Sequence, residues 1–194
     1  MPETASKRPS ILAIALIVFG IVGLIAAFAL TVEKFALLEH PADPLSCDLS
    51  PFFQCSKNLM SWQGSLFGFP NPILGIIGWS VVITVGVALI AGVSFPGWFW
   101  ALFNIGVVGA LALVIFLIGQ SIFVLGTLCP WCMVTWAVTI PTFFLVTLRN
   151  MSSGTLPGMR IGAAAYSWVP AITVICYIVI IVLGQVQLDV IHRL

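Results

Sequence analysis

Five long runs without a charged residue constrain this chain more than any other feature of its sequence. A helix needs about 20 apolar residues to cross a hydrocarbon core of about 30 Å. The chain is 61% hydrophobic and only 7% charged, whereas about a quarter of the residues in a soluble domain are charged. We therefore predict an all-α integral membrane protein, with residues 1–194 forming a single transmembrane domain. The predicted spans lie near residues 11–30, 73–93, 98–125, 129–148 and 161–188, and an outer loop covers residues 31–72.

The first and fourth of these spans need a closer look, the first because it could be a signal peptide and the fourth because it is short and contains a proline. Ala27-Phe28-Ala29 resembles a signal-peptide cleavage site that follows the basic residues Lys7 and Arg8. The apolar region of a signal peptide is about 7–15 residues long, so the longer first run favours an uncleaved helix. The fourth span contains Pro141, which neighbouring helices can accommodate in a bundle. That span is short unless its helix begins near Cys129.

Positive charges set the predicted orientation. Lys7 and Arg8 precede the first span, and Arg149 and Arg160 flank the connection between the fourth and fifth spans. Five spans place both segments on one side, which the positive-inside rule makes cytoplasmic. The outer loop and the turn before the fourth span then lie outside. No polybasic cluster accompanies the net charge of +1, so we predict no nucleic-acid partner.

Four of the five cysteines lie on that outer side. Cys47 and Cys55 are in the outer loop, and Cys129 and Cys132 form a Cys-Pro-Trp-Cys motif at the start of the fourth span. Disulfides persist outside the cytoplasm, and four cysteines allow three pairings among which the sequence does not choose. The two-residue spacing is typical of redox dithiols, and a helix start favours a thiolate. The loop pair could instead be a structural disulfide.

A metal site would be a further explanation of the cysteines. It would need two more ligands, and the only histidines are His40 and His192. We therefore predict no metal.

The outer loop contains a second patterned segment, residues 56–69. Leu59, Trp62 and Leu66 recur at helical spacing, and polar residues lie between them. This pattern predicts a short amphipathic helix at the membrane surface. Such a helix could form a lid over a pocket whose floor is the Cys129–Cys132 turn. A surface or re-entrant helix without a catalytic part is the alternative.

These motifs together resemble the vitamin K epoxide reductase family over about residues 11–150. The resemblance rests on Cys47-x7-Cys55, on Ser61, on the Gly68–Gly75 segment GFPNPILG and on the Cys129–Cys132 motif. DsbB-like proteins carry their two cysteine pairs in the opposite order. The resemblance implies a four-helix transmembrane bundle around a quinone, with a fifth transmembrane helix and a lid helix in the first outer loop.

The resemblance also implies roles for individual residues. Cys132 would lie against the quinone, Cys129 would exchange with Cys55, and Cys47 would face a protein partner. Ser61 and Asn71 match positions near the quinone. Trp136 stands where animal members often carry a tyrosine, and we place it beside the quinone, with a place in the interfacial aromatic belt as the alternative. This departure from the family pattern leaves open whether the chain reduces epoxides or is sensitive to coumarin-type inhibitors. The predicted cofactor-binding residues are therefore Ser61, Asn71 and Trp136.

The function implied by the resemblance is that of a membrane thiol oxidase in the bacterial inner (cytoplasmic) membrane. Many bacterial members fuse a thioredoxin-like domain after the fifth helix. This chain ends at Leu194, so we expect a separate DsbA-like, thioredoxin-fold partner, with menaquinone or ubiquinone as the electron acceptor. The alternative class is a non-enzymatic membrane carrier or structural subunit whose disulfides brace its loops. The spans lack the buried charges that usually mark ion paths.

Overall fold

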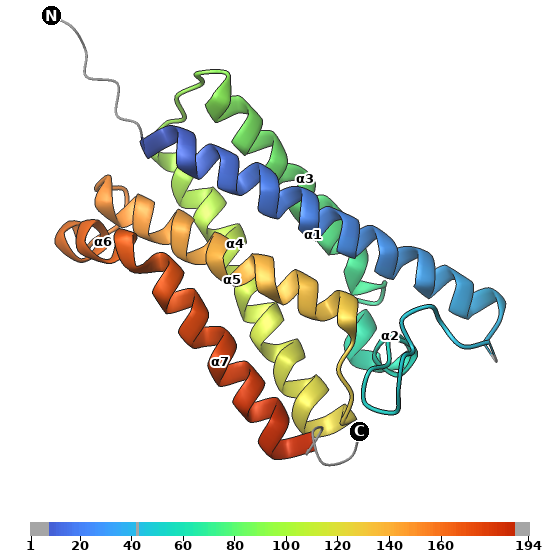
Figure 1. The fold of residues 1–194 in the computed structure, drawn as a ribbon. Coiled ribbons are helices and arrows are strands. Elements are labelled where there is room, and N and C mark those ends of the chain that lie inside the picture. The colour runs from blue at the N-terminus through green and yellow to red at the C-terminus, as the bar shows by residue number, and fades with distance from the viewer. Residues whose placement is uncertain (1–7, 42, 189–194) are drawn as a thin grey trace, which may run out of the picture.

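The computed structural model describes residues 8–41 and 43–188, and its regular structure is helical throughout that part of the chain. The long helices are α1 (Arg8–Glu39), α3 (Asn71–Ile90), α4 (Gly97–Gly119), α5 (Pro130–Ser152) and α7 (Val169–Leu188) (Figure 1). Shorter helices, α2 (Ser56–Met60) and α6 (Met159–Ala165), lie between them. Five helical segments of the described chain are long and apolar enough to cross a membrane. The predicted all-α membrane fold with five spans is confirmed.

Small residues bring α1 and α3 into close contact. A Cβ atom added to Gly23 would lie 2.2 Å from Cε2 of Trp79, and one added to Gly86 would lie 3.0 Å from the carbonyl oxygen of Ala13. Helices in lipid associate through such small residues because backbones can then approach closely. The two helices therefore lie side by side along the bundle (Figure 1).

The fourth span, α5, packs against α1, α4 and α7. It begins at Pro130, directly after Cys129, and continues through Pro141 to Ser152. Asn150, which is fully buried, donates a hydrogen bond from Nδ2 to the carbonyl oxygen of Trp100 at 2.9 Å. The Tyr177 hydroxyl donates to the carbonyl oxygen of Ala137. These contacts fix α4 and α7 against α5.

Helix α1 extends further than the predicted span of residues 11–30. It continues to Glu39, so the outer loop begins after this helix and not at residue 31. Its last turns are stabilised by tertiary contacts that the apolar pattern does not reveal. Leu37 packs into the cysteine cluster, and Lys34 Nζ donates to the carbonyl oxygen of Leu59 at 2.7 Å.

The segment of residues 56–69, called the lid segment below, is not the single amphipathic helix that its pattern predicts. The α2 helix stops at Ser61, whose backbone is extended, and a 3₁₀ turn, η1 (Trp62–Ser65), follows. The Ser61 hydroxyl donates to the carbonyl oxygen of Asn58 at 2.7 Å, which competes with helix continuation. The break turns Leu59 inward and leaves Trp62 64% exposed.

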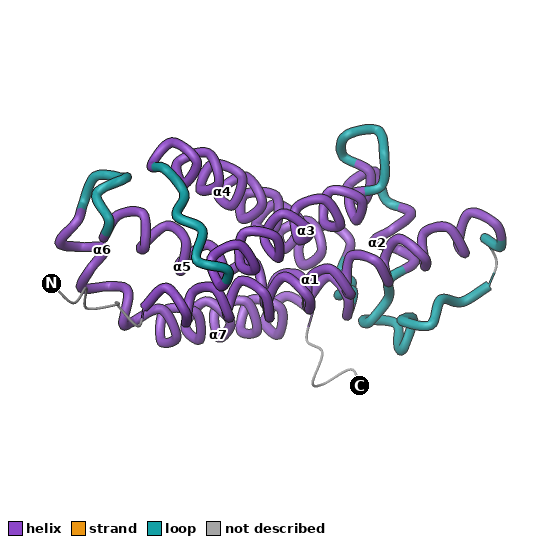
Figure 2. The backbone as a smooth tube through the Cα atoms, turned by 90° about the horizontal axis from the view of Figure 1, so that it is seen from above, coloured by secondary structure: helices purple, strands orange, loops and turns teal. Residues whose placement is uncertain are grey.

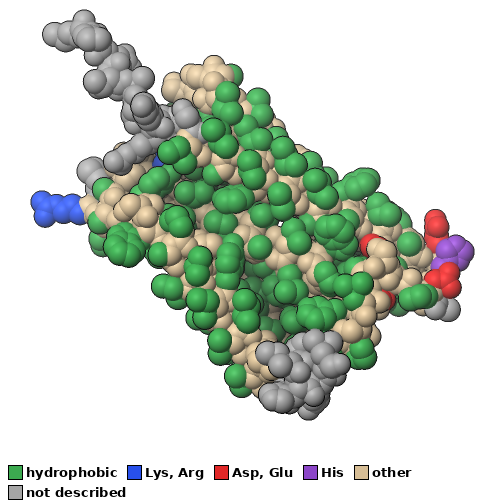
Figure 3. All heavy atoms as spheres, in the orientation of Figure 1, with side chains coloured by type: hydrophobic (Ala, Val, Ile, Leu, Met, Phe, Trp, Pro, Cys, Tyr) green, Lys and Arg blue, Asp and Glu red, His purple; other side chains and the backbone are tan. Residues whose placement is uncertain are grey.

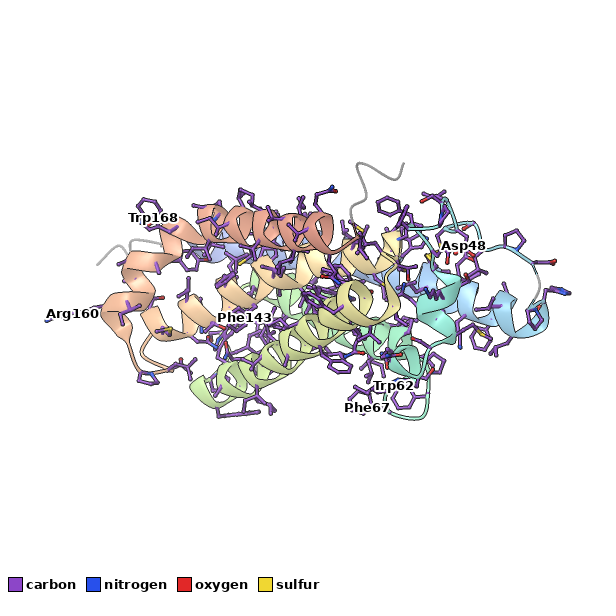
Figure 4. The ribbon with its side chains drawn as sticks, turned by 90° about the horizontal axis from the view of Figure 1, so that it is seen from below. Asp48, Trp62, Phe67, Phe143, Arg160 and Trp168 are labelled. Carbon is purple, nitrogen blue, oxygen red and sulfur yellow. A yellow bond between two sulfur atoms is a disulfide. The ribbon has the colours of Figure 1, made fainter. Side chains whose placement is uncertain are left out.

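Polar and apolar surfaces separate along the long axis of the bundle. Apolar side chains cover its middle, and the charged side chains visible on this face lie at the two ends (Figure 3). The lid segment and the neighbouring loop gather at one end (Figure 2). Asp48, Trp62 and Phe67 lie at that end, whereas Arg160 and Trp168 lie at the other (Figure 4). Exposed tryptophans near both ends match the aromatic belts of membrane interfaces.

Candidate active site

A single parallel β-bridge brings the two cysteine pairs together. It joins Phe53 to Leu128. The Gln54 N–H donates to the Leu128 carbonyl at 3.0 Å, and the Leu128 N–H donates to the Phe52 carbonyl at 2.7 Å. Cys129 directly follows Leu128, and Cys55 comes two residues after Phe53. The Sγ atoms of these two cysteines lie 3.3 Å apart, and both residues are 0% exposed. Thiol–disulfide exchange requires such a contact between sulfur atoms.

Cys47 and Cys55 form a disulfide with a Cα–Cα distance of 5.7 Å. Cys47 is only 5% exposed and packs with Leu37, Leu45 and other apolar side chains of one cluster. Cys129 and Cys132 are free thiols. The oxidised pair is therefore in the loop, and the reduced pair is at the start of α5.

The carboxylate of Asp48 organises the loop around this disulfide. Its Oδ1 accepts hydrogen bonds from the N–H groups of Cys55 at 2.7 Å and Ser56 at 3.1 Å. Its Oδ2 accepts from the N–H of Leu45 at 3.2 Å. Partial burial raises the pKa of Asp48, but these hydrogen bonds favour the charged form, and the net result is a lowered pKa.

Cys129 occupies the N-cap position of α5, where its Sγ accepts from the N–H of Cys132 at 3.4 Å. The hydrogen bond from the Cys132 side chain lowers the pKa of the Cys129 thiol, and the N–H groups of Cys132 and Trp131 lower it further. Burial and the nearby Asp48 carboxylate act in the opposite direction without cancelling that effect. With the loop disulfide closed, the Cys132 side chain and the N–H groups at the helix start therefore favour the charged form of Cys129.

A cavity of about 690 Å³ lies beside the lid segment and is lined by residues of α1, α3, α4 and α5. Cys132 lines it. On α4 the lining runs from Phe99 to Leu117, about 27 Å of helix at 1.5 Å per residue. Most polar lining residues lie at the lid end, whereas Thr139 and Thr142 lie further along α5, and the wall formed by α4 is apolar. The polar lining residues are Asn58, Ser61, Gln63, Asn71, Gln120, Thr135, Thr139 and Thr142.

Comparison with protein families identifies the chain. The model of the vitamin K epoxide reductase family matches residues 14–147. The chain belongs to the vitamin K epoxide reductase family. Membership implies a membrane enzyme that couples disulfide and quinone redox chemistry. A search of curated proteins found no matching relative.

Two of the three predicted quinone-binding residues of this family member line the cavity. The Ser61 hydroxyl uses its proton within the lid segment, on the carbonyl oxygen of Asn58. Asn71 donates from Nδ2 to the Gln63 carbonyl at 2.6 Å, and its Oδ1 accepts from the Leu66 N–H at 3.0 Å. Both side chains therefore hold the backbone of the lid segment in place.

Trp136, the third predicted residue, is buried but is not among the residues that line the cavity. The lining face of α5 consists of Cys132, Thr135, Thr139 and Thr142. At about 100° per residue, Trp136 is turned about 80° away from the centre of that face. A threonine at every third or fourth position of an otherwise apolar span was the sequence signal for this face.

A hydrogen-bonded pair between the lid segment and the residues that follow α4 was not predicted from the sequence. Gln63 Nε2 donates to Gln120 Oε1 at 3.0 Å. Gln120 begins a π-helical segment, η2 (Gln120–Leu125), that directly follows α4. π-Helical segments frequently occur at functional sites. Two polar residues, Gln120 and Ser121, inside an apolar span were the available signal.

Proposed function

We propose that this member of the family is a membrane thiol oxidase. It would take electron pairs from a separate DsbA-like, thioredoxin-fold partner and pass them through two dithiols to menaquinone or ubiquinone. Disulfide bonds would thereby form outside the cytoplasm. The supporting observation is the 3.3 Å contact between the Sγ atoms of Cys55 and Cys129, combined with the position of Cys132 on the cavity wall.

The first exchange takes place at the loop disulfide. A thiolate of the reduced partner attacks Cys47 Sγ, breaks the Cys47–Cys55 bond and releases the Cys55 thiolate. The second partner thiol then attacks the mixed disulfide, which releases the oxidised partner and a Cys47 thiol. Because Cys47 is 5% exposed, the loop around it has to move before a partner can reach its sulfur.

The second exchange moves the electron pair toward the cavity. Cys55 attacks Cys129 of an oxidised Cys129–Cys132 pair and releases the Cys132 thiolate. Cys47 then attacks Cys55, which rebuilds the loop disulfide and frees Cys129. The Cys129–Cys132 dithiol finally closes to a disulfide and gives two electrons and two protons to the quinone, which leaves as hydroquinone. The arrangement with a closed loop disulfide and two free thiols matches the stage before quinone reduction.

The cavity fits a quinone substrate chemically. Ligand pockets typically measure about 300–1,000 Å³, are mainly apolar and carry a few placed polar groups. Here polar side chains surround the lid end beside Cys132, and an apolar wall continues along α4 toward Phe99. The polar end suits a headgroup with two oxygens, and the apolar wall suits a hydrocarbon tail.

For the membrane orientation, we propose that the lid end faces the outside of a bacterial inner membrane and that the N-terminus is cytoplasmic. Arg149 and Arg160 lie near the end of the bundle opposite the lid segment. The lid end carries acidic side chains (Figure 3). Basic residues are enriched on the cytoplasmic side of membrane proteins.

Substitution of the cysteines tests the proposed function. Cys132→Ala should abolish quinone reduction by the purified protein, because the thiol on the cavity wall is lost, while the Cys47–Cys55 disulfide still forms. Cys129→Ala should leave Cys132 without its exchange partner, and a thiolate against a quinone should then give a visible charge-transfer absorption. Cys176→Ala is the matched control, since this free cysteine lies on α7. Wild-type quinone reduction by Cys132→Ala would refute the proposal.

A further inference from the structure

Gln63 carries a buried acceptor without a partner among the described residues. The residue is 3% exposed, and its Oε1 accepts no hydrogen bond in that part of the chain. Its Nε2 is already used on Gln120. Because Gln63 lines the cavity, a ligand in the cavity is the natural source of the missing donor. A buried carbonyl oxygen left unpaired is costly, so a ligand donor that reached this atom would stabilise the complex.

The other polar lid residues that line the cavity already use their donors, and the amide oxygens of Asn58 and Asn71 already accept hydrogen bonds. Asn58 accepts from Ser121 at Oδ1, and its Nδ2 donates to the Gln54 carbonyl and to Thr127. Ser61 has its proton on a backbone carbonyl, and Asn71 uses both amide atoms on the lid backbone. Of the polar lid side chains at the cavity, Gln63 is the one with an unsatisfied buried atom.

The threonines of α5 that line the cavity have no free hydrogen-bond donor for a ligand there. The hydroxyls of Thr135, Thr139 and Thr142 each donate to a backbone carbonyl of their own helix. They are therefore not free donors for a quinone oxygen. Among the polar side chains of the lid segment and of α5 that line the cavity, this leaves the amide of Gln63 to contact a headgroup oxygen as a donor.

The two redox forms of the substrate need opposite hydrogen-bonding partners from the Gln63 amide. A hydroquinone has O–H donors and suits Oε1 of Gln63. A quinone has only acceptors and needs an N–H. Because each amide group has both an acceptor and a donor, the bond between Gln63 and Gln120 can form in either sense. If both amide groups rotate by 180°, Gln63 Oε1 accepts from Gln120 Nε2, and Gln63 Nε2 takes the position of the unpaired atom.

We propose that Gln63 binds the headgroup directly in both redox states and that Gln120 positions its amide. This inference rests on the proposed quinone site. Gln63 accepts from the hydroxyl of the hydroquinone and, with the paired amides turned over, donates to the carbonyl of the quinone. One residue then serves substrate and product without movement of the lid segment.

Binding measurements on the full chain test this inference. The probes are duroquinone, durohydroquinone and the dimethyl ether of durohydroquinone, which has no O–H donor. A Cys132→Ala background prevents turnover, and tryptophan fluorescence reports binding because Trp79 lines the cavity. With Gln63 intact, durohydroquinone should bind about three- to tenfold more tightly than its ether, as expected for one hydrogen bond. In Gln63→Leu this preference should vanish, and duroquinone should bind about three- to tenfold more weakly.

Further variants separate binding from bracing of the lid. Gln63→Met, unbranched and of similar length, should lose the same preference if Gln63→Leu does not fold. Gln120→Leu should keep part of the preference, because Gln63 remains. Gln54→Leu is the matched control, since Gln54 does not line the cavity. If Gln63→Leu or Gln63→Met weakens hydroquinone and ether equally, or changes neither, the inference is wrong. If duroquinone fails to bind even with Gln63 present, the proposed quinone site itself is wrong.

Discussion

Asp48→Asn should loosen the loop that holds the Cys47–Cys55 disulfide. The carboxylate accepts three backbone N–H groups, from Leu45, Cys55 and Ser56, at 2.7–3.2 Å. Asparagine keeps one acceptor oxygen but turns an NH₂ group toward a backbone donor, and it removes the charge. The substitution therefore weakens the hydrogen bonds that join the two ends of the loop, while the side chain keeps nearly the same size.

The magnitude follows from these three bonds. Hydrogen bonds to charged groups contribute about 1.5–3 kcal/mol, against about 0.5–1.5 kcal/mol for neutral pairs. The difference is about 1 kcal/mol for each bond, and solvent screening reduces the sum because Asp48 is only half-buried. We expect a loss of about 1–2 kcal/mol, which raises the open population of the loop about 5- to 30-fold.

The rate at which a phosphine reductant cleaves the loop disulfide measures this opening, with the thiols counted by alkylation and mass spectrometry. Asp43→Asn, an exposed carboxylate in the same loop, is the control and should leave the rate unchanged. Because the pKa of Asp48 is lowered on folding, its stabilisation is fully present above the ordinary value of 3.8 and is lost as the pH falls through the lowered pKa. A rate increase below twofold for Asp48→Asn at pH 7 would refute this reasoning. A difference in rate between Asp48→Asn and the wild-type protein that stays equally large in acid would also refute it.

Two further predictions concern the helix bundle and its orientation. Gly23→Ala should lower the free energy of unfolding by about 1–3 kcal/mol and weaken quinone binding, because the added Cβ would lie 2.2 Å from the Trp79 indole on the cavity wall. Gly184→Ala is the control, because its Cβ meets nothing within 4 Å and Gly184 does not line the cavity. An impermeant amine reagent should label the exposed Lys57 in intact cells, whereas external trypsin should not cleave at Arg160. External cleavage at Arg160 would reverse the proposed orientation.

The transmembrane architecture was predictable because lipid imposes one requirement on every span. Backbone groups in hydrocarbon must pair within their own segment, so a charge-free run of sufficient length becomes a helix. The start of α5 was also visible in the sequence, since Pro130 suits the first helical position. These features depend on local composition, and tertiary packing does not override them.

Other features depended on contacts between distant segments and were missed. The extension of α1 to Glu39 is stabilised by Lys34 and the lid segment, 25 residues later. The break at Ser61 puts a polar side chain, Gln63, inside and an aromatic one, Trp62, outside, which reverses the order that an amphipathic helix would give. The face of α5 that meets the cavity depends on how this helix is rotated against α4. The Cys-x-x-Cys motif alone does not reveal that rotation.

The hydrogen bonds of the outer region divide it into two parts with different freedom. The lid segment forms hydrogen bonds with three parts of the bundle. Its partners are Lys34 on α1, Ser121 and Gln120 on η2, and Thr127 before α5. The disulfide loop before it depends strongly on the carboxylate of Asp48. A partner that needs Cys47 should therefore displace the disulfide loop while the lid segment stays in place. Cys132 and the cavity would then remain covered during the thiol exchange, so that access of the protein partner and access of the quinone are controlled by different segments.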